Sequence, residues 1–119
     1  MASPLSLVNS GKVREIYEVG NDRLLIVTSD RISAFDVVLD DPIPQKGHVL
    51  TGLSTFWFDL TRDMVANHMI SSDPTDLPEA AGPEVAGRSM LVHRAQPVKM
   101  ECVVRGYLAG SAWQEYKSG

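Results

Sequence analysis

Cysteine is nearly absent from this sequence, since Cys102 is the single example among 119 residues. One thiol excludes both a disulfide within the chain and a zinc site built from cysteines, and it fits a reducing compartment. No apolar run reaches membrane-spanning length, and the first residues lack the charged start and apolar centre of a signal peptide. We therefore expect a soluble, cytoplasmic protein that does not enter a membrane.

An excess of positive charge is also missing. Eleven lysine and arginine residues stand against fifteen aspartate and glutamate residues, which gives a net charge of −4. This balance argues against nucleic acid or an anionic membrane as the main partner, although local basic clusters can still bind small anions. The length and the hydrophobic fraction of 44% are those of about one globular domain with a real core.

The most informative stretch lies near the end of the chain. Residues 98–105 alternate between apolar side chains and a row that includes Lys99, Glu101 and Arg105, which predicts a strand with one charged face. Two glycines then predict a turn, and Ser111, followed three residues later by glutamine, is typical of a helix N-cap. An arginine and a helix start can both bind anions, but an ordinary strand–turn–helix with a surface ion pair explains the same pattern.

Two further strands are predicted near the start of the chain. Residues 11–17 alternate, with Lys12 and Arg14 on one face, and residues 24–27 form a short apolar run that is typical of a buried strand. The residues between them have the chemistry of a hairpin turn. Such a hairpin, with two cations beside a glycine, could cover a polyphosphate, whereas the simpler interpretation is a pair of solvated strand residues.

A dense polar segment follows at residues 29–36. It holds two carboxylates, two hydroxyl groups and an arginine directly after the apolar run, and such density is typical of a functional loop on a rigid scaffold. The alternative is that Ser29 or Ser33 and the two aspartates, Asp30 and Asp36, only cap turns.

The clearest helix is predicted over residues 47–68. Its large apolar side chains recur at steps of three and four, which predicts one stripe that faces the core: Leu50, Leu53, Trp57, Leu60 and Met64. Residues 71–88 are acidic and rich in proline and glycine, so we expect an irregular surface loop rather than a calcium site. Residues 89–93 return to strand character.

Four blocks of sequence together resemble the SAICAR synthetase family of purine biosynthesis, in this order: SGKVREIYEV, SDRISAFDVV, IPQKGHVLTGLSTFWF and LVHRAQPVKMECVVRGYLAGSAWQEY. The resemblance extends from about residue 10 to residue 119. It implies an ATP-dependent ligase that joins L-aspartate to the carboxylate of carboxyaminoimidazole ribonucleotide through an acyl phosphate. ATP, L-aspartate and carboxyaminoimidazole ribonucleotide are then the expected partners.

The resemblance also implies roles for individual residues. ATP-binding roles fall on four residues: Lys12, Arg14, Lys99 and Glu101. Substrate-binding roles fall on four more: Asp30, Ser33, Arg105 and Ser111. Catalytic roles fall on Asp36 and Arg105. No residue of this chain is expected to bind metal, since the family's Mg²⁺ ligands are expected in a C-terminal part that these 119 residues lack.

The implied fold is α+β, in which a twisted antiparallel sheet, similar to a kinase small lobe or an ATP-grasp domain, packs with one or two helices. Residues 1–119 are then the N-terminal, ATP-covering lobe. We expect this lobe to be inactive alone and to associate either with the C-terminal segment or with itself. A non-catalytic phosphate-binding module is the main alternative, and a kinase-like phosphotransferase is disfavoured because no HRD or DFG sequence occurs.

Overall fold

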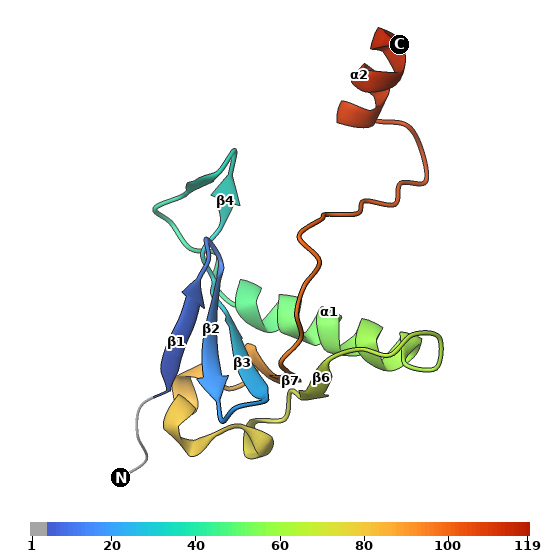
Figure 1. Cartoon of the computed structure of the whole chain (residues 1–119). Helices are drawn as coiled ribbons and strands as arrows, with labels where there is room; N and C mark the ends of the chain where they lie inside the picture. The colour runs from blue at the N-terminus through green and yellow to red at the C-terminus, as the bar shows by residue number, and fades with distance from the viewer. Residues whose placement is uncertain (1–4) are drawn as a thin grey trace.

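A five-stranded antiparallel sheet forms the body of the protein (Figure 1). The structure is a computed structural model, and it describes residues 5–119. The strands lie in the order β1-β2-β3-β7-β6. Their bounds are Ser6–Ser10 for β1, Arg14–Val19 for β2, Arg23–Thr28 for β3, Met69–Ser71 for β6 and Ser89–His93 for β7. The strands predicted near residues 11–17, 24–27 and 89–93 are therefore confirmed.

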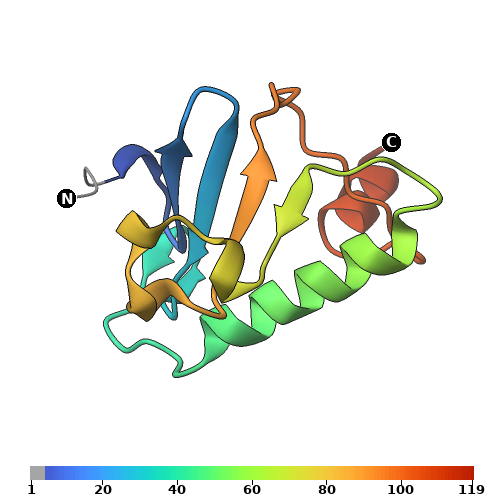
Figure 2. The same cartoon turned by 90° about the horizontal axis from the view of Figure 1, so that it is seen from below.

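The two faces of this sheet are covered differently. Helix α1, Lys46–Thr61, lies along one face (Figure 2). Three short 3₁₀ turns cover part of the other face: η1 at Pro74–Asp76, η2 at Glu79–Ala81 and η3 at Pro83–Val85. Val85 packs against Leu25 and Val27 of β3, and all three are buried. The loop expected to be solvated thus contributes to the core, because its apolar residues cover β3.

Helix α1 departs from its prediction in length and in orientation. It ends at Thr61 rather than near residue 68. The predicted core stripe is wrong at Leu53, Trp57 and Leu60, which are all more than half exposed, whereas Leu50 is half-buried between α1 and the sheet. Gly47 explains the orientation, since a Cβ at that position would lie 2.7 Å from the carbonyl oxygen of Thr28. The glycine therefore allows the helix to approach β3 closely with this face inward.

A small second sheet projects from the body. It is a hairpin of β4, Ser33–Ala34, and β5, Val37–Val38. The two residues of its turn, Phe35 and Asp36, have φ angles of 48° and 68°. Two-residue hairpin turns favour this left-handed region, but side chains other than glycine, asparagine and aspartate adopt it at a cost.

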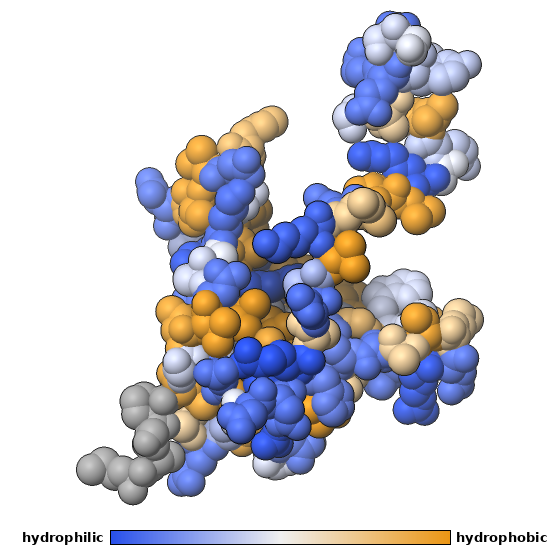
Figure 3. Space-filling model, viewed as in Figure 1, coloured by the Kyte–Doolittle hydropathy of each residue, from blue (hydrophilic) through white to orange (hydrophobic). Residues whose placement is uncertain are grey.

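The last 26 residues form a tail that leaves the body (Figures 1 and 3). The strand predicted over residues 98–105 is not present, because no partner strand among residues 5–119 pairs with its backbone. The radius of gyration is 16.9 Å, against roughly 13–14 Å for a compact domain of this length.

The tail ends in helix α2, Ser111–Ser118, so the predicted helix is confirmed. Its start differs by one residue, since Gly110 is the N-cap and no side chain caps the helix. Gly110 has a φ of 59°, which a serine would adopt only with strain.

Candidate functional site

The loop between β1 and β2, residues 11–13, is held in a defined shape. The N–H of Gly11 donates to the carbonyl oxygen of Arg14 at 2.7 Å. Both the backbone N–H and the hydroxyl group of Ser29 donate to the carbonyl oxygen of Val13, each at 3.0 Å. The glycine and the serine thus fix both ends of a short turn that carries Lys12 between them.

Arg31 supports the same loop from the polar segment. Its Nε donates to Ser29 Oγ at 3.1 Å, and a terminal nitrogen donates to the carbonyl oxygen of Gly11 at 3.4 Å. That nitrogen also lies 3.5 Å from a carboxylate oxygen of Glu15. From the sequence, Arg31 had no assigned role and Ser29 had only a possible turn-capping role, although both belong to the dense polar segment. Long-range contacts of this kind leave no mark on sequence periodicity.

Lys12 connects the β1–β2 loop to the β4–β5 hairpin. Its Nζ donates to a carboxylate oxygen of Asp36 at 2.5 Å. The hydrogen bond from Lys12, together with its charge, holds the pKa of Asp36 below its usual value. The Lys12 side chain is about half exposed and the Asp36 side chain is almost fully exposed. Lys12 is therefore reachable by an anion from solvent, with Asp36 as its present partner.

Asp30 orients the start of helix α1. Its two carboxylate oxygens accept the backbone N–H groups of Gly47 at 2.8 Å and of Gln45 at 3.1 Å. The hydrogen bond from Gly47 is the largest cause that lowers the pKa of Asp30. Its carbonyl oxygen accepts a further N–H from Ile43 at 2.8 Å. Both carboxylate oxygens are thus engaged with the backbone that precedes and begins α1.

The other predicted site residues fall into two groups. Arg14 follows the β1–β2 loop directly as the first residue of β2, and Ser33 is the first residue of β4. Arg14 also lines a cavity of about 100 Å³ between the sheet and α1. The remaining four lie in the tail and are exposed: Lys99, Glu101, Arg105 and Ser111.

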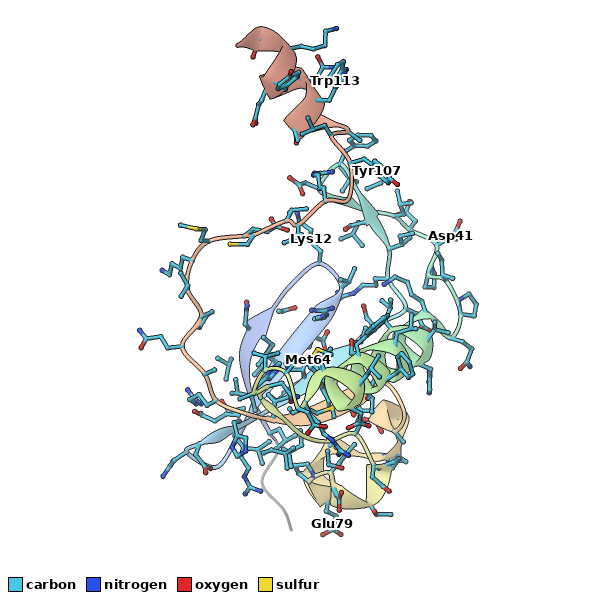
Figure 4. The ribbon with its side chains drawn as sticks, turned by 90° about the vertical axis from the view of Figure 1, so that its right-hand side faces the viewer. Lys12, Asp41, Met64, Glu79, Tyr107 and Trp113 are labelled. Atoms are coloured by element: carbon cyan, nitrogen blue, oxygen red, sulfur yellow. The ribbon has the colours of Figure 1, made fainter. Side chains whose placement is uncertain are left out.

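The predicted site residues in the tail do not contact those around the β1–β2 loop through a hydrogen bond or an ion pair. Within residues 5–119, no hydrogen bond or ion pair links residues 98–119 to the β1–β2 loop or the β4–β5 hairpin. All three segments nevertheless extend toward the same end of the molecule, where Figure 4 labels Lys12 and Tyr107. Two larger cavities, of about 340 and 310 Å³, lie along the 3₁₀ turns and are lined by neither group.

The described residues do not fit a magnesium site. Mg²⁺ prefers several carboxylate oxygens and waters at once. Among residues 5–119, no three aspartate, glutamate, histidine or cysteine side chains converge in that way. Asp30 is occupied by backbone N–H groups, and Asp36 by Lys12. No helix of the described part of the chain is long and apolar enough to cross a membrane.

The fold and this arrangement define an α+β lobe whose antiparallel sheet presents a lysine-bearing loop beside a polar hairpin. A model of the SAICAR synthetase family matches residues 7–119, so the chain belongs to that family.

Two relatives support the assignment, and each is named phosphoribosylaminoimidazole-succinocarboxamide synthase. The one from Desulfosudis oleivorans is 59% identical over 116 residues, which cover 95% of this chain and 39% of the relative. The one from Trichlorobacter lovleyi is 57% identical over 117 residues, which cover 96% of this chain and 39% of the relative. The chain therefore spans about two-fifths of the length of these relatives.

A solved structure has the same fold over this part. SAICAR synthase from Saccharomyces cerevisiae, solved in complex with SAICAR, superimposes with a TM-score of 0.86 at 44% identity. The match covers 96% of this chain and 42% of the yeast chain. The fold class expected from the sequence, an α+β lobe built on an antiparallel sheet, is confirmed.

Proposed function

We propose that residues 1–119 are the N-terminal, ATP-covering lobe of a ligase that joins L-aspartate to the carboxylate of carboxyaminoimidazole ribonucleotide. The observation that carries this proposal is the family match over residues 7–119, together with a fixed loop that presents Lys12. The relatives bear the name of a succinocarboxamide synthase, and the yeast structure is a complex with SAICAR.

Lys12 and Arg14 would neutralise the phosphates of ATP. A carboxylate is a poor electrophile, so a ribonucleotide carboxylate oxygen first attacks the γ-phosphorus, and ADP leaves. The amino group of aspartate then attacks the carbonyl carbon, loses a proton, and expels phosphate as the amide bond forms. Fixed cations lower the barrier of the first step because charge moves onto the leaving phosphate oxygen. The magnesium ion that such chemistry uses would be held by residues beyond 119.

The hydrogen bond between Lys12 and Asp36 is central to this role. In the structure the ammonium group lies against Asp36. When a polyphosphate binds, Lys12 can contact both anions, because a lysine ammonium has three N–H donors. Asp36 would thus hold the lysine near the phosphates and lie at the reacting end of the substrate. Asp30 and Ser33 would shape the substrate side from the same segment.

The tail would supply the second half of the site. Arg105 can bind a carboxylate or a phosphate with two parallel hydrogen bonds. Ser111 adds a hydroxyl group beside the first N–H groups of α2, while Lys99 and Glu101 would border ATP. These residues are exposed and apart from Lys12 in this chain. The downstream three-fifths of the enzyme would have to bring the tail to the loop.

The separation of the tail from Lys12 favours an alternative function for the 119-residue chain when it is alone. With the tail apart from the loop, these 119 residues can act as a phosphate-binding module that performs no chemistry. Weak ATP binding without product would support that alternative.

Product formation tests the proposal. In a chimera, the 119 residues would replace the matching part of the Desulfosudis oleivorans relative. We expect this chimera to form product from ATP, aspartate and the carboxylated ribonucleotide, while the 119-residue chain forms none. Arg105→Ala should abolish turnover of the chimera. Turnover by the short chain alone, or an active Arg105→Ala chimera, would contradict the proposal.

A further inference from the structure

The outward face of helix α1 is apolar. Its residues recur at steps of three and four and so share one side of the helix: Val49, Gly52, Leu53, Phe56, Trp57 and Leu60. We call this set the outer stripe. Its five large side chains are each between 51% and 58% exposed. Figures 1 and 2 show α1 with the sheet on one side and no described element on the other.

The inward face of the same helix is mixed. It contains Gly47 and Thr51, which are buried, and Ser54 and Thr55, which are half-buried. Leu50 and Phe58 also lie on this side, half-buried beside the cavity between α1 and the sheet. The hydroxyl group of Thr55 donates to the carbonyl oxygen of Thr51 and lies 3.1 Å from Ser72 Oγ. A helix with one face in water normally carries charged and polar residues on that outward face, whereas the outward face of α1 is the more apolar one. This arrangement is typical of a helix packed between two layers.

Charge is also absent from the outer stripe. The sixteen residues of α1 include only two with a full charge at neutral pH, Lys46 at the first position and Asp59 near the end. Solvated helices usually carry charged residues along the whole open face. Charged residues are depleted at the centres of protein interfaces.

Gly52 provides an independent observation. A Cβ at this position would meet no atom within 4 Å. Glycine inside a helix is less stable than alanine, and nothing in the described structure requires it here. By contrast, Gly47 allows contact with β3. A glycine in the middle of an apolar face lets another backbone approach closely, so the stripe is shaped for a tightly packed segment rather than for water.

We propose that the outer stripe binds polypeptide that follows residue 119 in full-length members of the family. The chain spans 39% of the Desulfosudis oleivorans relative, so most of that protein lies outside these residues. The tail that leads toward it also exposes apolar side chains, among them Val98, Val104 and Tyr107. Uncovered apolar surface thus lies on both α1 and the tail. The inference rests on family membership and not on the ligand-binding roles proposed above.

Thiol labelling tests this interface without reference to activity. Leu53→Cys is made in a Cys102→Ser background, both in the 119-residue chain and in the chimera described above. Asn21→Cys, in the exposed turn between β2 and β3, is the matched control. Modification of each engineered position is followed by peptide mass. We expect position 53 to react at least tenfold more slowly in the chimera, while position 21 reacts equally in both proteins.

A second pair of variants separates burial from a local disturbance. Leu53→Gln keeps the side-chain size but adds a polar amide, whereas Leu53→Met keeps the apolar character. In the chimera, Leu53→Gln should lower Tm by about 4 °C and Leu53→Met by less, while neither should change Tm of the short chain by more than about 1 °C. Equal labelling of position 53 in both proteins would overturn the proposal. Protection found only in a dimeric chimera and lost on dilution would also overturn it, because a second copy would then be the occupant.

Discussion

Adding one methyl group to α1 should have opposite effects at two positions only five residues apart. At Gly47, the new Cβ would lie 2.7 Å from the Thr28 carbonyl oxygen and 3.3 Å from the Arg88 Cβ. At Gly52, it would meet nothing within 4 Å. Both substitutions are glycine to alanine in the same helix, so each serves as the control for the other.

Two opposing effects determine how much each substitution changes the free energy of unfolding. Overpacking a buried site costs ~2 kcal/mol, while alanine stabilises a helix by up to ~1 kcal/mol relative to glycine. Gly47→Ala should therefore destabilise the 119-residue chain by ~1–2 kcal/mol. The new Cβ cannot push the Thr28 carbonyl oxygen aside freely, because this oxygen also accepts a hydrogen bond from the Arg88 guanidinium at 2.9 Å. Gly52→Ala should stabilise the chain by ~0.5–1 kcal/mol.

Urea unfolding at low protein concentration measures both changes in free energy, and thermal unfolding measures the corresponding shifts in Tm. At about 4 °C per kcal/mol for a chain of this size, Tm should fall by about 4–8 °C for Gly47→Ala and rise by about 2–4 °C for Gly52→Ala. If Gly47→Ala were as stable as the parent, helix α1 could not approach β3 as described. If both variants lost stability, the outer side of α1 would already be covered in the short chain.

Three further predictions concern charged residues. Asp30→Asn should make the free energy of unfolding depend less on pH in the acid range. The pKa of Asp30 is lowered in the folded chain, so the stability that its carboxylate contributes is present above the unfolded pKa of about 4 and is lost as pH falls below that value. Urea unfolding at pH 3–6 measures this, and an unchanged acid limb would exclude the role of Asp30 at the start of α1. Lys12→Met should return the pKa of Asp36 toward its usual value in a carboxyl NMR titration, whereas an unchanged titration would show that the pair does not form in solution. Arg105→Ala should leave Tm of the short chain within about 1 °C because the tail is exposed, and a large loss would show that the tail packs on the body.

The elements that could be predicted from the sequence are those determined by local pattern. The β3 run from Leu24 to Val27 pairs with strands on both sides, and its residues are alternately half-buried and buried, so a continuous apolar segment was a sufficient signal. The helix at residues 111–118 was also evident, although Gly110 rather than Ser111 is its N-cap. The family resemblance rested on whole blocks of residues, and the family match supports it.

The errors arose where a local pattern depends on a distant partner. Residues 98–105 alternate as a strand does, but a strand needs a neighbour for its backbone groups, and residues 5–119 offer none there. In α1, periodicity correctly revealed an apolar stripe through Leu53 and Trp57 but not the side that it faces. Gly47 decides that orientation through its contact with Thr28, which no periodicity reveals. The ligand-binding roles of Arg105 and Ser111 remain predictions.

The KM for ATP of the chimera, compared between the parent and Lys12→Met, is the most direct test of the lobe as an ATP-binding unit. Methionine keeps most of the length of lysine and removes the ammonium group, with an uncharged sulfur in place of one methylene. We expect KM for ATP to rise at least tenfold, with KM for aspartate nearly unchanged, because the charge at position 12 would contact phosphate and not the amino acid. An unchanged KM for ATP would contradict the proposal that the β1–β2 loop binds the phosphates.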